Sequence, residues 1–538
     1  MALARTHAMS LVGVQGHPVE IEADIENGLV ALLLVGLPDT ALREARDRIR
    51  AAIVNSGETW LHRRITVGLS PASLPKRGSG FDVGIAVAIL AAADAVPAER
   101  LAGMVFLGEL GLDGRVRAVP GVLPAAAAAA AAGFQRIAVP PENAAEAALI
   151  PELEVLSAPT LSALLAWLRG QERPDGDGAW LVDKACLADA EAAATAEAAA
   201  SPGATRSGAA GAAGVAGGQG LDLADVIGQP VARRAAEICA AGGHHLLLLG
   251  PPGVGKTMLA ERLPTILPRL ELAEALEVSS IHSVAGRLPS RQPLIIEPPF
   301  CAPHHTATKA AIVGGGSGVI RPGAASLAHH GCLFLDEAPE FDRNVLDALR
   351  QPLESGQVSI ARSGLTATFP ARFTLILAAN PCPCARSSSA GSACTCTPLV
   401  RRRYLARLSG PLLDRVDVKV ELLPVGRAEL LSDRQLAEPS AVVAARVAQA
   451  RQRAGRRLEG TRWRLNAQIP GAELRRSFRP APGALIPVER AMDLGEISAR
   501  GVDRIVRMSW TLADLAGVDT PGQDEVGYAL GLWLGVGQ

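Results

Sequence analysis

The chain has 538 residues, of which 49% are hydrophobic and 20% are charged, and its formal net charge is -1 at pH 7. This length and apolar content predict about three or four domains with sizeable cores. The balanced charge excludes a strongly basic overall field, so any contact with nucleic acid has to come from local clusters. The apolar runs near residue 30 and at 125–132 are too short or too weakly hydrophobic to cross a bilayer, and the N-terminus lacks the apolar core of a signal peptide. We therefore expect a cytoplasmic protein with no membrane partner.

Residues 1–170 alternate strand-like and helical segments. Apolar runs at 30–38, 64–71 and 104–110 indicate strands. Residues 40–57 have apolar side chains at helical spacing, between a threonine cap and a glycine. This alternation predicts a compact α/β domain.

Two stretches of this part resemble the Lon-protease-like domain of several bacterial ATPases. They are LPKRGSGFDVGIAVAIL at 74–90 and LGELGLDGRVRAVPGVLPAA at 107–126. The resemblance implies an α+β domain of the ribosomal S5 domain 2-like type. An active protease of this type needs a serine nucleophile and an activating lysine, but the corresponding positions are Gly80 and Leu123. A neighbouring serine, Ser79, is displaced by one residue, so we expect a catalytically inactive scaffold.

Residues 171–221 predict a linker. Their composition is dominated by alanine and then by glycine, alanine and serine, and the stretch ends in GAAGVAGGQG. Few large apolar side chains are present, so the later part of the segment has little to bury.

The stretch GPPGVGKT follows the apolar run 246–249 and leads into a helical segment, which is the context of a phosphate-binding loop. Its glycines let backbone N–H groups point at phosphate oxygens. We expect Lys256 to contact the β and γ phosphates and Thr257 to ligate Mg²⁺. The alternative, a turn that binds nothing, is disfavoured because every fixed position of the motif is filled. The predicted ATP-binding residues of this loop are Gly250, Pro251, Pro252, Gly253, Val254, Gly255, Lys256 and Thr257.

Two later strands end in polar residues. The apolar run within 332–341 ends in Asp336, expected in the Mg²⁺ shell, and Glu337, expected to activate the attacking water. The apolar run that begins at residue 373 ends at Asn380, whose amide is suited to orienting that water. The alternatives are a solvated strand end for the two acids and a turn residue for Asn380.

Arg415 lies between two acids after a helical run. In a ring, an arginine at this place would reach the γ-phosphate of the neighbouring subunit and stabilise the charge of the transition state. The alternative is an ion pair within the chain.

Residues 354–373 predict a hairpin of two alternating strands, with Arg362 next to its tip. Arg362 and Lys309, which lies in a glycine-flanked insertion, are candidate contacts for DNA phosphates, with a solvated cation as the alternative. His304 and His305 are adjacent on an extended segment, so we expect them to point to opposite faces and to have a structural role.

Four cysteines form two C-x-C pairs separated by nine residues: Cys382, Cys384, Cys394 and Cys396. Four thiolates in one short loop can enclose Zn²⁺ tetrahedrally. The spacing differs from the usual C-x₂-C pattern, and the alternative is a loop of reduced thiols.

Several long motifs resemble the ComM (YifB) family of Mg-chelatase-like AAA+ ATPases. They are APHHTATKAAIVGGG (302–316), RPGAASLAHHGCLFLDEAPEF (321–341), LRQPLESGQV (349–358), AANPCPC (378–384) and YLARLSGPLLDRVD (404–417). The resemblance covers nearly the whole chain, including the Lon-like front. It implies a P-loop AAA+ module at 222–425, with a parallel sheet flanked by helices and a Cys-rich insertion, and a Mg-chelatase C-terminal-like helical lid at 426–538.

For this family the resemblance implies a ring, expected as a hexamer, that uses ATP and Mg²⁺ to drive branch migration on single-stranded or branched DNA during natural transformation. It places the lid arginine that touches ATP at Arg500, with Arg504 one turn later as the alternative. An earlier lid helix at 441–458 carries four arginines that either meet DNA or remain solvated. They are Arg451, Arg453, Arg456 and Arg457.

Two other functions stay open on the sequence. One is a Mg-chelatase-type motor subunit, against which stand the Lon-like front and the absence of a porphyrin-handling module. The other is a nucleotide-switched regulatory or assembly platform, against which stands Glu337, because a pure switch needs no base.

Overall fold

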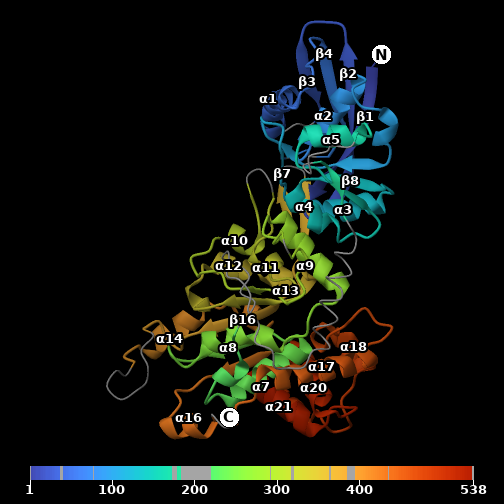
Figure 1. Cartoon of the computed structure of the whole chain (residues 1–538). Coiled ribbons are helices and arrows are strands. Elements are labelled where there is room, and N and C mark those ends of the chain that lie inside the picture. Colours follow the sequence, from blue (N-terminus) through green and yellow to red (C-terminus); the bar gives the residue numbers. More distant parts are fainter. Residues whose placement is uncertain are drawn as a thin grey trace.

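A computed structural model gives the fold (Figure 1). It describes residues 2–36, 40–74, 76, 78–171, 178–182, 220–290, 292–316, 320–362, 365–384, 394–433 and 436–535. Figure 1 shows the N-terminal unit at the top, a second sheet with its helices in the middle and the C-terminal helices at the bottom. Most of the predicted linker lies outside the described residues, and the division of the chain at residues 170, 221 and 425 stays a prediction.

An eight-stranded mixed sheet forms the N-terminal unit, in the order β10-β9-β8-β5-β1-β2-β4-β3. Its two longest strands, β1 and β2, pair antiparallel over their length, and their buried residues alternate with more exposed ones along β2. The strands are β1 (Ala2–Val12), β2 (Gln15–Glu26), β3 (Ala31–Val35), β4 (Arg64–Ser70), β5 (Met104–Phe106), β8 (Arg136–Val139), β9 (Glu154–Ser157) and β10 (Trp180–Leu181), with β6 (Glu109–Leu110) and β7 (Val116–Arg117) in a separate ribbon.

Helices pack on this sheet, and α2 (Asp82–Ala92) is the most central of them. It is buried at every residue and contacts β1 and β2, as expected for a helix that is apolar all round. The other helices are α1 (Thr40–Asn55), η1 (Ala98–Leu101), α3 (Val122–Ala131), α4 (Pro141–Ala147) and α5 (Leu161–Leu168). The α/β alternation expected from the sequence is present here.

The residues near the missing protease dyad are engaged elsewhere. The Ser79 hydroxyl contacts the Glu109 carboxylate, and the Lys76 ammonium donates to the Pro71 carbonyl. The side chain of Leu123, at the predicted lysine position, is buried in the core. These contacts support a scaffold role, which stays a prediction.

A five-stranded parallel sheet, in the order β12-β13-β16-β11-β17, forms the middle of the molecule. The first strand of this sheet in the sequence, β11, lies between the last two, so the loop after β11 opens at a point where strand order reverses. The strands are β11 (Leu246–Leu249), β12 (Phe300–Cys301), β13 (Cys332–Leu335), β16 (Thr374–Ala379) and β17 (Val418–Glu421). The parallel sheet of the expected P-loop module is therefore present.

Helices surround this sheet and continue into the C-terminal part of the chain. Around the sheet lie η2 (Leu223–Asp225), α7 (Pro230–Gly242), α8 (Lys256–Arg262), η3 (Leu263–Ile266), α9 (Leu272–Val284), α10 (Lys309–Val313), α11 (Ala324–Leu327), η4 (Ala338–Glu340), α12 (Arg343–Ala348), α13 (Arg350–Ser355), α14 (Pro398–Leu405) and α15 (Gly410–Leu413). The C-terminal helices are α16 (Arg427–Asp433), α17 (Ser440–Arg457), η5 (Asn466–Gln468), α18 (Gly471–Arg476), α19 (Ile486–Asp493), α20 (Ala499–Ala516) and α21 (Gln523–Leu534). None of the helices in the described ranges is both long and apolar enough to span a membrane.

The predicted hairpin is present as β14 (Gln357–Arg362) and β15 (Leu365–Pro370), and it packs against the N-terminal unit. Phe369 shares a small apolar cluster with Val12 at the end of β1. Gly13 has a φ of 67°, and a Cβ there would meet the Thr368 carbonyl oxygen at 2.6 Å, so only glycine fits this close approach. The hairpin is thus supported from the side by the first sheet.

The basic helix α17 corrects a sequence expectation. Arg451 donates to the Ala240 carbonyl, and Arg453 donates to the Asp514 carbonyl. Arg457 forms an ion pair with the Asp514 carboxylate and lies 4.4 Å from the Trp510 ring centre. Arg451 thus ties α17 to α7, and Arg453 and Arg457 tie it to α20. Arg453 remains exposed, but Arg451 and Arg457 are partly buried, so these two are not part of a solvated row.

Candidate nucleotide site

The glycine loop between β11 and α8 forms a cradle. Gly253 and Gly255 have φ values of 82° and 93°, a region that favours glycine. A Cβ at Gly250 would lie 2.6 Å from the Leu422 carbonyl oxygen, so the loop passes directly over β17. The first turn of α8 begins at Lys256, directly after the loop. The strand, loop and helix expected from the sequence are therefore in place.

Lys256 lies in this cradle without a carboxylate partner. Its ammonium donates to the carbonyls of Gly250 at 2.6 Å and Pro251 at 2.9 Å, and to Asn380 Oδ1 at 2.9 Å. Burial lowers the pKa of Lys256, and the nearby charges of Asp336 and Glu337 act in the opposite direction. A mostly buried cation held by neutral oxygens, beside a loop of backbone amides, fits a polyphosphate.

Thr257 and Asp336 meet at the carboxyl edge of the sheet. The Thr257 hydroxyl donates to Asp336 Oδ2 at 2.8 Å, although 79 residues separate them. A hydroxyl and a carboxylate in contact are a donor set that suits Mg²⁺, which is bound by a few protein oxygens and by phosphates. The residues present therefore fit ATP with Mg²⁺.

Glu337 stands next to this pair in an uncommon backbone conformation. Its φ is 49°, in the left-handed region that non-glycine residues rarely adopt. The Asp336 Oδ1 atom accepts the backbone N–H of Glu337 at 2.9 Å, and the Glu337 side chain is half-exposed. The chain leaves the strand at this turn, and the Glu337 carboxylate stays accessible to solvent.

His305 is a site residue that the sequence reasoning missed. Its Nδ1 lies 3.4 Å from Glu337 Oε2. The expectation that His304 and His305 point to opposite faces is wrong, since their ring centres are 4.1 Å apart. The chain turns at residues 305–306, so the alternation of an extended strand does not apply. In the sequence, the position of His305 was signalled by the apolar pair Phe300–Cys301. This pair forms β12, which pairs with β13 and brings the segment that follows it to Glu337.

The arginines expected to act on ATP have different surroundings. Arg415 is buried, contacts the Glu354 carboxylate and the Pro411 carbonyl, and has no hydrogen-bond partner at Nε. Arg500 is exposed in the first turn of α20 and forms no ion pair with the described residues. Arg504 pairs instead with the buried Asp417 at 2.8 Å.

Arg362 and Lys309, the candidate DNA contacts, are both exposed. Arg362 is the last residue of β14, where the hairpin turns, and Lys309 begins α10 behind a Thr308 cap. The structure does not bring either residue into the nucleotide cradle.

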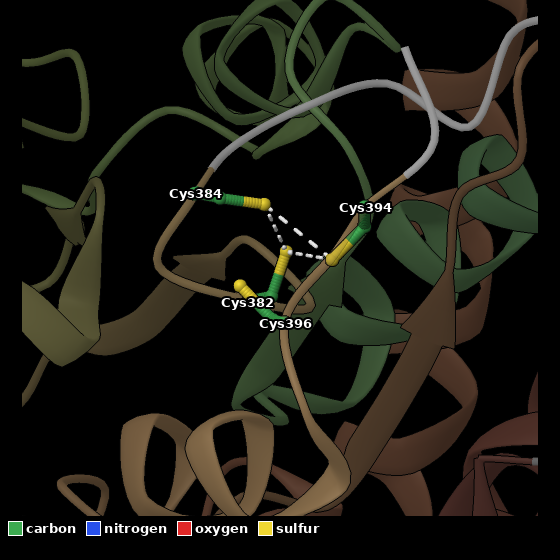
Figure 2. A group of neighbouring side chains, drawn as sticks. All are labelled: Cys382, Cys384, Cys394 and Cys396. Carbon is green, nitrogen blue, oxygen red and sulfur yellow. Dashed lines mark hydrogen bonds between the residues drawn. The ribbon is translucent and has the colours of Figure 1, made fainter.

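The four cysteines converge (Figure 2). Cys382 Sγ lies 3.1 Å from Cys384 Sγ and 3.4 Å from Cys394 Sγ, and Cys384 Sγ lies 3.4 Å from Cys394 Sγ. All four sulfur atoms, including that of Cys396, lie within 4.8 Å of one another. A backbone N–H of Cys396 and the thiols of Cys382 and Cys384 lower the pKa of Cys394 to about 6, whereas burial raises that of Cys382 to about 12. The two sequence pairs thus form one sulfur cluster.

Three family models match the chain. The model described as magnesium chelatase, subunit ChlI, matches residues 222–430, and the model of its C-terminal part matches residues 437–532. A further model, described as subunit ChlI of Mg-chelatase, matches residues 21–143.

Full-length relatives are also similar. An uncharacterized protein of Mycobacterium tuberculosis is 49% identical over 98% of both chains. The protein YifB of Salmonella typhimurium is 42% identical over 96% of this chain and 94% of its own. The competence protein ComM of Haemophilus influenzae is 40% identical over 99% of this chain and 97% of its own.

Proposed function

The chain belongs to the ComM (YifB) family of Mg-chelatase-like AAA+ proteins, and from this premise we propose that it is a ring-forming motor that hydrolyses ATP to move DNA. The observation that carries the ATPase part is the buried Lys256, bonded to Asn380, beside the contact of Thr257 with Asp336. Residues from three segments distant in sequence meet there at the phosphate-binding loop.

The residues of this site have distinct proposed roles. Lys256 and the loop amides bind the β and γ phosphates, and Thr257 with Asp336 would hold Mg²⁺, which neutralises phosphate charge when bound. Glu337 takes the proton of the attacking water. Asn380 stands within reach of Lys256, where its amide orients that water.

Completion of the site in a ring is part of the proposal. Arg415 would exchange its Glu354 partner for the γ-phosphate of the neighbouring subunit, and its unpartnered Nε supports this exchange. Arg500 would reach ATP from the lid of the same subunit. A closed ring gives every subunit such a neighbour. We propose a hexamer, the ring that the family resemblance implies.

The DNA part of the proposal rests on the family and on the exposed cations. One relative is named a competence protein, so we propose branch migration during recombination of incoming DNA. Arg362 at the hairpin tip and Lys309 would contact phosphates of single-stranded or branched DNA without sequence preference.

The test is ATP hydrolysis by the purified full-length protein with and without single-stranded and branched DNA. We expect DNA to stimulate hydrolysis, and we expect Glu337→Gln to abolish the stimulated rate while ATP still binds. A Lys256→Ala protein that hydrolyses ATP at the normal rate would refute the site. Hydrolysis that is indifferent to all DNA would favour a chelatase-type motor or a platform and overturn the DNA part.

A further inference from the structure

We propose that Cys382, Cys384, Cys394 and Cys396 hold one Zn²⁺ ion, which fastens the end of β16 to the start of α14 beside the nucleotide site. Zinc binding does not depend on the proposed function, whereas the effect of zinc on catalysis rests on the proposed ATPase activity.

The sulfur geometry fits a tetrahedral ion. Zinc bound at about 2.3 Å by four thiolates separates the sulfur atoms by about 3.8 Å. The sulfur distances here are 3.1 to 3.4 Å for three pairs, and all lie within 4.8 Å. Figure 2 shows Cys384 and Cys394 directing their sulfur atoms from opposite sides toward Cys382, with Cys396 beside it. A small contraction or expansion of this cluster produces the coordination sphere.

Disulfides explain the cluster less well than a metal. A disulfide needs sulfur atoms about 2.05 Å apart, and all four cysteines are free thiols. No single disulfide uses four convergent sulfur atoms, whereas a structural zinc site uses all four and leaves no open position. The half-buried position of three of the thiols gives an ion a route in from solvent.

In the second group of possible ligands, the histidine with the most buried side chain has no free lone pair. Glu277, His329 and His330 also converge. However, His329 Nδ1 accepts the backbone N–H of Arg372 at 2.9 Å, so its Nε2 carries the proton that faces Glu277 at 3.0 Å. Among the described residues, the cysteine cluster is therefore the stronger metal site.

The location of the cluster gives the ion a consequence for catalysis. Cys382 follows Asn380 by two residues, and Asn380 bonds Lys256. Cys396 directly precedes Thr397, which caps α14 by accepting the backbone N–H of Val400. Zinc would therefore fix the chain on both sides of the insertion and hold the strand end that carries Asn380.

The far end of the same segment is also anchored near the acids. Arg407, just after α14, donates to the Pro339 carbonyl at 3.1 Å and pairs with Glu340 at 3.0 Å. Both partners lie in the turn that follows Glu337. The segment from Asn380 to Arg407 therefore begins and ends at the nucleotide site, with the cluster between the two anchors.

Metal analysis of the full-length protein, purified without chelator, tests the site. We expect about one zinc per chain, falling below about one per five chains in Cys384→Ser and Cys396→Ser. Cys301→Ala, which removes a buried cysteine outside the cluster, is the control and should keep its zinc. Less than about one zinc for every four wild-type chains, or iron in its place, overturns the assignment.

Replacement of zinc by cobalt tests the site by absorption spectroscopy on the wild-type protein, without any variant. Cobalt(II) added to the zinc-depleted wild-type protein should produce the strong thiolate absorption and visible bands of a tetrahedral four-sulfur site. Absence of these bands in a protein that still binds ATP overturns the proposal.

A double-mutant cycle tests the positioning role. Cys384→Ser should lower kcat about tenfold with little change in the KM for ATP, as expected for loss of a supporting contact. If zinc acts through Asn380, the double variant with Asn380→Ala should be no slower than Asn380→Ala alone. Additive effects overturn the positioning role, while an inactive wild type that contains zinc overturns the ATPase proposal instead.

Discussion

Arg504→Ala should destabilise the protein because it leaves a buried carboxylate without its main partner. Asp417 is fully buried directly before β17, and Arg504 Nη1 lies 2.8 Å from its Oδ1. Burial raises the pKa of Asp417, but the charge of Arg504 and the neighbouring His244 imidazole outweigh it and hold the pKa well below its usual range. Removing one partner of a buried pair costs about 3–5 kcal/mol. Because Asp417 keeps His244 at 3.4 Å, we expect about 3 kcal/mol.

Urea unfolding of the wild type and the variant, followed by tryptophan fluorescence and circular dichroism, measures this effect. With a slope of about 3 kcal/mol/M, the midpoint should fall by about 1 M. Asp417→Asn combined with Arg504→Ala should recover part of the loss, since the uncompensated charge is then gone.

Arg500→Ala is the matched control on the same helix. Arg500 is exposed, so its loss should shift the midpoint by less than about 0.2 M. If Arg500 touches ATP as proposed, the same variant should raise the KM for ATP. Equal destabilisation by the two variants would refute the reasoning, and an unchanged KM in Arg500→Ala would remove that residue from the nucleotide site.

Three further outcomes are expected. His305→Ala should lower kcat for ATP about tenfold with little change in KM, because His305 faces Glu337, whereas His304→Ala should change kcat less than threefold, about 0.6 kcal/mol. Burial lowers the pKa of His245 to about 4, so the unfolded chain binds a proton that the folded chain does not. This group should contribute a loss of about 3 kcal/mol of stability between pH 6.5 and 4, and His245→Asn should remove that contribution in urea titrations at several pH values, while His329, whose pKa burial also lowers to about 4, keeps its own. Arg362→Ala should reduce the slope of DNA affinity against salt by about one without changing sequence preference, and an unchanged slope would remove Arg362 from the phosphate contacts.

Local spacing accounts for what could be predicted. The phosphate loop, the acids after β13 and the amide after β16 follow from apolar runs that end in polar residues, because parallel strands of one sheet present their carboxyl ends at the same edge. The family follows from long motifs. Thr257 and Asp336 come into contact because the loop after β11 and the acids after β13 lie at this same edge.

Contacts that depend on packing between distant segments could not be predicted. The charge run on α17 has the composition of a solvated face, yet Arg457 finds Asp514 because α20 lies against it. Arg500 is exposed, whereas Arg504 is engaged by Asp417, which lies 87 residues earlier in the chain. Spacing within the helix could therefore not show which of the two arginines is free. His305 likewise reaches Glu337 only because β12 joins the edge of the sheet.

The close fit of Gly13 under Thr368 indicates that the N-terminal unit limits bending of the hairpin. A free two-stranded ribbon bends easily under load, but this hairpin rests on the end of β1 through Phe369 and Val12. A force on the hairpin near Arg362 is therefore resisted by β1, against which the hairpin packs. Removal of residues 1–221 would uncover this apolar contact and leave the hairpin without the support of the first sheet.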